Sequence, residues 1–206
     1  MVVNIKKLIE NYQTYTDKYF LRSKQILQAE SINPVVRYQV FARKDIPSLK
    51  GINDATDFIR GVVGNKVKIY SLKEGDSYTS GESIMKLEGR VQDLVDLETV
   101  YLGILSGSIT PPIDMVEVRE KARAIKQAAG SKNLYYGGAR HFNPNLDEQI
   151  ARICFEEGFS GTSTDIGAKA WGAEGMGTIP HALIISYAAH MQENNIQGNP
   201  TVEALK

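Results

Sequence analysis

The sequence predicts an α/β protein whose first half mixes helices with strands and whose second half repeats strand–helix units. Three observations support this class. Apolar residues recur at helical spacing in several segments, they alternate as in strands in others, and after residue 132 short strands alternate with helices. Such alternation is typical of parallel βα units. We place the domain change between residues 107 and 132, which divides the chain into 1–110 and 111–206.

The first half begins with two helices. Apolar residues at helical spacing predict the first near the N-terminus, and Thr16 and Asp17 offer an N-cap for the second, KYFLRSKQILQAE. The segment DATDFIRGVV predicts a third helix that ends at Gly64. Strands are expected at VVRYQVFAR, VKIYSL and ESIMKLEGR, since apolar and polar residues alternate there or turn residues flank the run.

A long helix is expected next, because an apolar stripe runs from Leu94 to Ile104. Asp114 then caps a helix that ends before Gly130. The remaining elements predicted in order are a strand at NLYYGG, a helix over 146–157, a strand or tight loop at GFSGTS, a helix over 164–171 and a helix from about His181.

Composition argues against several classes of function. The 206 residues include 24 basic and 24 acidic side chains, so net charge favours neither nucleic acid nor a membrane surface, although a local anion site stays open. The one cysteine, Cys154, lies in an apolar helical pattern and is expected to be a buried thiol. The sequence holds no P-loop, no GxGxxG after a strand, no metal-ligand spacing and no GxSxG. With no long apolar stretch and no signal-peptide core, we expect a cytoplasmic protein.

Three clusters of glycine and polar residues follow predicted strands or open helices: GGARHFN, GTSTD and GTIPH. In parallel βα folds such loops carry the chemistry. Glycine lets backbone N–H groups approach a ligand closely, and a helix N-terminus favours an anion. The sequence therefore predicts an anion site formed by these loops.

Each candidate residue also has a structural interpretation. Arg140 could grip a phosphate or carboxylate bidentately, or pair with a local carboxylate such as Asp147. The hydroxyls around Ser163 could recognise a small ligand or cap the next helix. His181 could be a nucleophile, an acid–base group or a phosphate contact, or a solvated first-turn histidine. Tyr19 and Arg22 share a helix face and could form a ligand shelf or a surface cation–π pair.

Taken together, TDKYFLRSKQIL, YYGGARHFNP, GFSGTS and GTIPHALI resemble the motifs of nicotinate phosphoribosyltransferase in its compact archaeal-like form. They match its early Asp-x-Tyr helix, its FGxRxxHP-like strand end, its GTS loop and its GTxxH motif, in order, from about residue 14 to 190. The resemblance implies an N-terminal α/β sandwich followed by the first part of an irregular α/β barrel. It also implies the reaction of nicotinate with phosphoribosyl pyrophosphate to nicotinate mononucleotide and pyrophosphate, in the salvage route to NAD.

The resemblance assigns roles to the motif residues. His181 matches the histidine through which many members couple the reaction to ATP hydrolysis, as a phosphohistidine. Tyr19 matches the aromatic that stacks on the pyridine ring from the other subunit of a dimer. Arg140 matches an arginine near the phosphate and carboxylate groups, and Ser163 matches the position facing the carboxyl substituent of the ring. Mg²⁺ is implied as the ion that neutralises the pyrophosphate leaving group.

Asp17 and Thr178 belong to the same motifs and are expected to bind substrate. The family has an aromatic at the position of Gly137, and the adjacent Tyr136 is the candidate to replace it as a second ring-stacking residue. The chain ends before the remaining barrel of the family. We therefore expect a truncated or split form with little turnover by itself, paired as a homodimer or with the missing C-terminal half.

Three other interpretations stay open. SLKEGDSYTSGESIMKLEG resembles a biotinyl or lipoyl carrier pattern, in which Lys86 would be the attachment point on an exposed hairpin. Quinolinate or nicotinamide could replace nicotinate as the substrate. The chain could also be a non-catalytic remnant that binds a partner.

Overall fold

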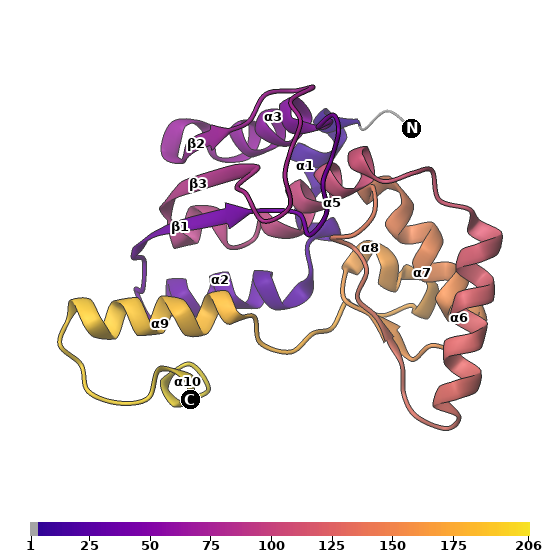
Figure 1. Ribbon diagram of the computed structural model, residues 1–206. Helices are drawn as coiled ribbons and strands as arrows, with labels where there is room; N and C mark the ends of the chain where they lie inside the picture. Colours follow the sequence, from indigo (N-terminus) through magenta and orange to yellow (C-terminus); the bar gives the residue numbers. More distant parts are fainter. Residues whose placement is uncertain (1–3) are drawn as a thin grey trace.

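The computed structural model describes residues 4–206 and arranges them as a mixture of helices and two small sheets (Figure 1). The helices are α1 Ile5–Tyr15, α2 Lys18–Ala29, α3 Ile52–Val63, α4 Val91–Leu94, α5 Glu98–Ile109, α6 Met115–Ala129, α7 Asp147–Glu156, α8 Asp165–Ala168, α9 His181–Glu193 and α10 Pro200–Glu203. The strands are β1 Val35–Val40, β2 Lys68–Ser71, β3 Met85–Arg90, β4 Tyr135–Tyr136 and β5 Gly161–Thr162. The predicted α/β class is confirmed.

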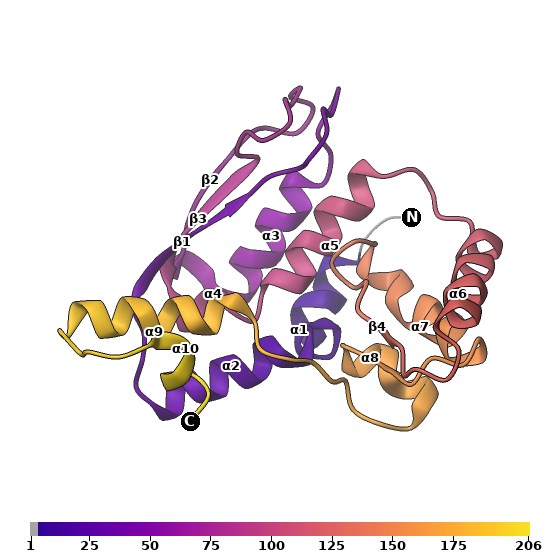
Figure 2. The ribbon, with the colours of Figure 1, turned by 60° about the horizontal axis from the view of Figure 1, so that its bottom comes forward.

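The first sheet is antiparallel, with strand order β1-β3-β2, and α1, α3 and α5 pack together beside it (Figure 2). Met85 and Leu87 of β3 are buried in the core, whereas Lys86 between them is exposed. This alternation follows from the period of two along a strand. The main core of the protein therefore lies between this sheet and the three helices.

The second sheet is parallel and pairs Tyr135 with Gly161 and Tyr136 with Thr162. It joins β4 and β5, while α7 connects them and packs against α6 and α8. The predicted parallel βα unit is thus confirmed, and Cys154 is buried in its core as expected. The boundary at residue 110 stays a prediction.

The two sheets are linked through the start of α2. Asp17 forms an isolated bridge to Thr164, and the Lys18 backbone N–H donates to the Ser163 carbonyl at 2.7 Å. After the loop that follows α8, the chain returns to the first half, where α9 packs along α2 (Figures 1 and 2). Loops from both halves of the chain therefore meet at one place.

Local signals predicted most element boundaries correctly. Helix α3 ends at Gly64, and the side chain of Asp114 accepts a hydrogen bond from the Val116 N–H at the start of α6, which ends before Gly130. The long helix expected after residue 90 is instead interrupted between α4 and α5, where Asp96 turns into the interior. Its carboxylate accepts hydrogen bonds from Tyr12 and Lys24, which explains why a charged side chain is buried there.

Two further expectations are wrong. Asp17 occupies the N-cap position of α2, but within residues 4–206 its side chain accepts no hydrogen bond from the backbone of that helix. Lys86 lies in the middle of β3, the central strand, opposite Gln39 and Tyr70, and not on a hairpin turn. A carrier lysine must swing free on a turn, so the carrier interpretation is rejected. Among the described residues, no helix has the length and apolar character needed to span a membrane.

Candidate functional site

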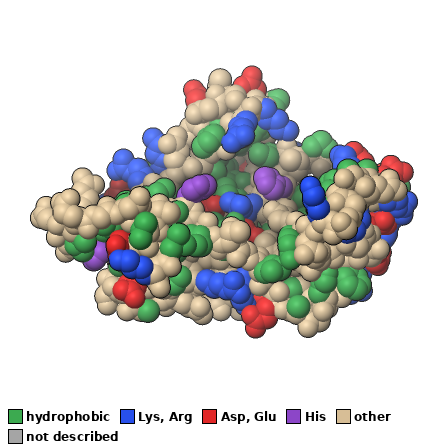
Figure 3. Space-filling model, turned by 90° about the horizontal axis from the view of Figure 1, so that it is seen from below, with side chains coloured by type: hydrophobic (Ala, Val, Ile, Leu, Met, Phe, Trp, Pro, Cys, Tyr) green, Lys and Arg blue, Asp and Glu red, His purple; other side chains and the backbone are tan. Residues whose placement is uncertain are grey.

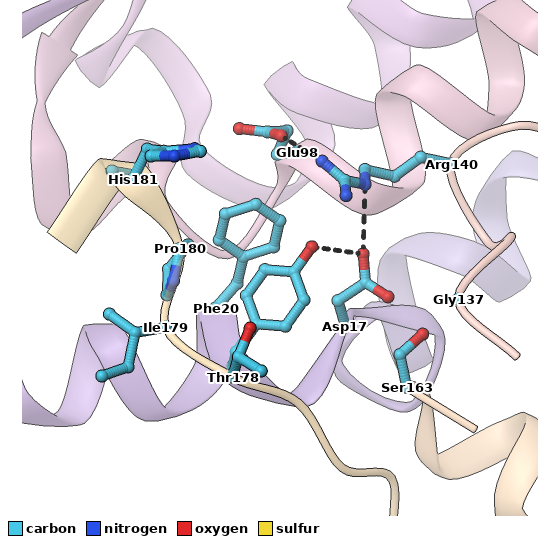
Figure 4. A pocket seen from close by; sticks show the side chains of 12 residues that line it. Asp17, Phe20, Glu98, Gly137, Arg140, Ser163, Thr178, Ile179, Pro180 and His181 are labelled. Carbon is cyan, nitrogen blue, oxygen red and sulfur yellow. Dashed lines mark hydrogen bonds and ion pairs between the residues drawn. The ribbon is translucent and has the colours of Figure 1, made fainter. Parts of the chain in front are cut away.

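A cavity of about 400 Å³ lies where the two halves meet (Figure 4). This volume is within the range of small-molecule sites, about 300–1,000 Å³. Segments distant in the sequence line it, namely Asp17, Tyr19, Phe20, Glu98, Gly137, Arg140, Ser163, Thr178, Ile179, Pro180, His181 and Ala182. The structure therefore brings six predicted site residues into one pocket: Asp17, Tyr19, Arg140, Ser163, Thr178 and His181.

The face of the molecule seen in Figure 3 shows histidine and charged side chains around a central hollow. Backbone N–H groups at the start of α2 connect the segments that line the pocket. The Asp17 N–H donates to the Thr99 hydroxyl at 3.0 Å, and the neighbouring Lys18 N–H bonds the loop that carries Ser163. These contacts attach α2 to both α5 and β5.

Arg140 is the only basic lining residue with a permanent charge, and it lies between two carboxylates. Its Nη1 donates to Glu98 Oε1 at 3.0 Å, and its Nε lies 3.3 Å from Asp17 Oδ2. The guanidinium carbon also lies 6.0 Å from the centroid of the Tyr19 ring, a cation–π contact. Arg140 does pair with carboxylates, but they are not the local one, Asp147, that sequence proximity suggested.

Asp17 is the buried anchor of this cluster, with only 2% of its surface exposed. Its Oδ2 accepts hydrogen bonds from the Tyr19 hydroxyl at 3.2 Å and the Thr99 hydroxyl at 3.1 Å. Burial and the Asp17 charge raise the pKa of Tyr19, so the phenol stays neutral. The structure places Tyr19 in the pocket of its own chain, whereas the resemblance implied that it reaches a partner subunit.

The GTSTD cluster divides between the two interpretations considered for it. The Thr164 hydroxyl accepts the Gly167 N–H and so caps α8, while it donates to Asp147. Ser163 instead lines the pocket, and its buried Oγ has no hydrogen-bond partner within the described part of the chain. An unpaired buried hydroxyl costs about 1–3 kcal/mol, so this group is available to a ligand.

His181 is the first residue of α9 and is exposed at the rim of the pocket. Figure 4 shows it on the opposite side of Glu98 from Arg140. Its imidazole makes no side-chain hydrogen bond to any group in residues 4–206, so both ring nitrogens are open to an incoming ligand. Thr178, three residues earlier, is likewise exposed on the loop that leads into the helix.

Tyr136 is the one predicted site residue that the structure does not bring to the pocket. Its ring packs in the core with Ala122, Ile150 and Cys154. Gly137, which directly follows β4, lines the pocket, whereas the Tyr136 side chain lies in the core. Arg22 also lies elsewhere, in a separate cavity, which excludes the shelf suggested with Tyr19.

Sequence reasoning missed Phe20 and Glu98. In the sequence, Phe20 has the pattern of an apolar residue on a helix face. Glu98 has the pattern of an acidic residue that stabilises the first turn of a helix. Only the fold brings Glu98 to Arg140, 42 residues further along the chain. Within the described residues, no group of three or more His, Cys, Asp or Glu side chains could hold a metal ion.

Comparison with known proteins identifies the class first. A family model described as "Quinolinate phosphoribosyl transferase, N-terminal domain" matches residues 17–108. The first half of the chain is thus similar to the N-terminal domain of that family. More particularly, about two thirds of the chain is similar in sequence to curated nicotinate phosphoribosyltransferases. Nicotinate phosphoribosyltransferase 1 of Arabidopsis thaliana is 26% identical over 143 residues, which cover 68% of this chain and 24% of that protein.

One solved structure supports the fold. A Saccharomyces cerevisiae protein described as a nicotinate phosphoribosyltransferase superposes with a TM-score of 0.65 at 13% identity, covering 89% of this chain and 59% of that one. Nicotinate-nucleotide pyrophosphorylase from Pyrococcus furiosus is 29% identical, with a TM-score of 0.44, covering 96% of this chain and 50% of that one. The chain spans about a quarter of the length of the curated relatives that it matches.

Proposed function

We propose that this chain takes part in nicotinate phosphoribosyl transfer, in which nicotinate and phosphoribosyl pyrophosphate give nicotinate mononucleotide and pyrophosphate. The observation that supports this most is the shared pocket. Arg140, Ser163 and His181 come from three separate loops and line one cavity, as a site for a planar acid beside phosphate groups requires. Relatives described as nicotinate phosphoribosyltransferases support the same substrate.

The reaction forms a bond between the pyridine nitrogen and the anomeric carbon of ribose and breaks the bond from that carbon to the pyrophosphate oxygen. Positive charge develops on the ribose and negative charge on the leaving group. Positioning and anion stabilisation therefore contribute more than a strong nucleophile.

We propose a separate role in substrate binding for several of the residues that line the pocket. Arg140 binds an anionic group of the substrate, and the unpaired hydroxyl of Ser163 donates to the ring carboxylate. The Tyr19 ring packs on the pyridine, while Asp17 holds both Tyr19 and Arg140 in place. Thr178 contacts substrate from the exposed loop.

Mg²⁺ would enter with the pyrophosphate, because the Asp17 and Glu98 carboxylates already face Arg140 and offer no preformed cage. It supplies charge neutralisation of the leaving group. We also propose that an imidazole nitrogen of His181 attacks the γ-phosphorus of ATP, the bond to the β-phosphate oxygen breaks and ADP leaves. Water later hydrolyses the phosphohistidine to phosphate, and this cycle is the basis of ATP coupling. Its position at the N-terminus of the 13-residue helix α9 supports this role, since the helix dipole favours an anion there.

The direct test combines binding and turnover. Calorimetry should detect nicotinate binding to the wild-type chain. Chromatography should detect nicotinate mononucleotide when phosphoribosyl pyrophosphate and Mg²⁺ are added to a form that also carries the remaining part of the barrel, and little product from the 206-residue chain alone. R140M and S163A should weaken nicotinate binding at least about tenfold, consistent with the loss of a charged or buried hydrogen bond. E148Q, which changes a half-exposed carboxylate that pairs with Lys169 outside the pocket, is the matched control. Unchanged affinity in R140M and S163A would overturn the proposal.

Quinolinate is the second candidate substrate, because the matching family model is that of quinolinate phosphoribosyl transferase. The same assay distinguishes the two. Quinolinate must lose its second carboxylate as CO₂ to give the same product, so CO₂ release identifies it. We further propose that the active form is a homodimer or a complex with the remaining part of the barrel. Sedimentation of the chain with and without nicotinate tests this.

A further inference from the structure

The cluster around Arg140 carries an excess of negative charge. One guanidinium lies between two carboxylates, with Asp17 Oδ2 at 3.3 Å from Nε and Glu98 Oε1 at 3.0 Å from Nη1. A substrate anion entering this pocket meets a net charge of about −1 and an arginine whose charge is already compensated. An anion can therefore bind Arg140 here only if one of the two carboxylates moves away from it.

The two carboxylates differ in how firmly they are held. Asp17 is 2% exposed and also accepts hydrogen bonds from the Tyr19 and Thr99 hydroxyls. The Glu98 side chain is 20% exposed, and Arg140 is its only side-chain hydrogen-bond partner within residues 4–206. Burial raises the pKa of Glu98, so its surroundings disfavour its charge. Glu98 is therefore the carboxylate that can leave Arg140 at lower cost.

Glu98 borders a second cavity as well as the pocket. Glu98 also lines a cavity of about 500 Å³ between β1 and α9. Tyr38 lines the same cavity, and its buried hydroxyl has no hydrogen-bond partner in the part of the chain that the structure describes. After burial, the charge of Glu98 is the largest cause that raises the pKa of Tyr38, so the two groups are close enough to interact. A phenol hydroxyl is a suitable donor to a carboxylate.

We propose that Glu98 is a specificity-determining residue that pairs with Arg140 as the structure shows and moves to the Tyr38 hydroxyl when the anionic group of a substrate takes its place. This inference rests on the proposed function, namely that the pocket binds a carboxylate or phosphate. A ligand with a negative charge can displace Glu98 from Arg140, whereas a neutral ligand of the same shape cannot. Glu98 thereby selects a pyridine acid over its amide.

The first test measures binding of nicotinate and of nicotinamide, its neutral counterpart, by calorimetry. E98Q removes the competing charge and keeps the side-chain shape, so it should bind nicotinate about tenfold more tightly than wild type. Nicotinamide binding should change less than about twofold. E88Q is the matched control, because Glu88 is also 20% exposed and ion-paired, to Arg37 and Lys68 on the first sheet. E98A should reproduce the result should E98Q fail to fold.

The second test is a double-mutant cycle with Y38F, which deletes only the unpaired hydroxyl. Y38F should weaken nicotinate binding several-fold in the wild-type background and have no effect in the E98Q background. Y70F, at an exposed tyrosine of β2, serves as its control.

Each alternative outcome is informative. Weaker nicotinate binding by E98Q would mean that Glu98 only holds Arg140 in position, which overturns this inference and leaves the proposed function intact. Equal effects of Y38F in both backgrounds would likewise exclude Tyr38 as the second position. If neither wild type nor any variant binds nicotinate, the proposed function fails and this inference fails with it.

Discussion

Asp147 allows a prediction of how the free energy of unfolding changes with pH, because it is a buried acid. It contacts Thr164, the residue that follows Ser163. It is 2% exposed and accepts a hydrogen bond from the Thr164 hydroxyl. Its Oδ1 has no hydrogen-bond partner within residues 4–206. Burial raises the pKa of Asp147 from 3.8 to about 6, which exceeds the lowering caused by its hydrogen bonds.

The size and sign of the effect follow from linkage. Well below pH 3.8 the folded and unfolded states both carry the proton. Between pH 4 and 6 the unfolded chain loses it while the folded protein keeps it, so the free energy of unfolding falls as pH rises through this window. At about 1.4 kcal/mol per pKa unit, the change from 3.8 to about 6 corresponds to about 3 kcal/mol at neutral pH.

Replacement of Asp147 by asparagine removes this pH dependence, since the amide keeps an oxygen to accept from Thr164 and carries no charge. Urea denaturation should show D147N to be more stable than wild type by up to about 3 kcal/mol at pH 7.5, and by only about 0.5 kcal/mol at pH 4. Other titrating groups are common to both proteins and cancel in the difference.

E148Q is the control for this experiment, because Glu148 lies in the same helical turn but its side chain is 44% exposed. Its difference from wild type should be small at every pH. A D147N protein that is less stable than wild type at pH 7.5, or a difference that does not vary with pH, would refute the reasoning.

The other predictions concern the pocket. R140M leaves the buried Asp17 carboxylate without its positive partner and should lower the free energy of unfolding by about 3 kcal/mol in urea, with part of the loss recovered in D17N/R140M. No recovery would argue against charge imbalance as the cause. S163A should weaken nicotinate binding without lowering the melting temperature, because its hydroxyl is unpaired in the fold; a large drop in melting temperature would contradict this. H181N should remove ATP stimulation more than basal turnover, measured as product formed with and without ATP. Equal loss of both would exclude the phosphohistidine.

Features decided by neighbouring residues were predictable from the sequence. Helix α6 begins at Asp114 and ends at Gly130 because capping depends on side chains and backbone within one turn. The strands of the first sheet were located by alternation, and the parallel pair by short strands between helices. The pocket residues from the recognised motifs were likewise predictable, since the family resemblance depends on local segments.

Tertiary structure alone decided how these residues interact. Asp17 reads as a helix cap, yet its carboxylate contacts Thr99 and Arg140, residues that only the fold brings near it. The residues next to Tyr136 in the sequence do not predict that its ring packs in the core. Nor do the residues around Glu98 predict that it pairs with Arg140. The sequence by itself therefore determined which side chains the pocket has available. Their pairing, and with it the charge balance of the site, depends on long-range packing, because ion pairs form between groups close in space at any separation along the chain.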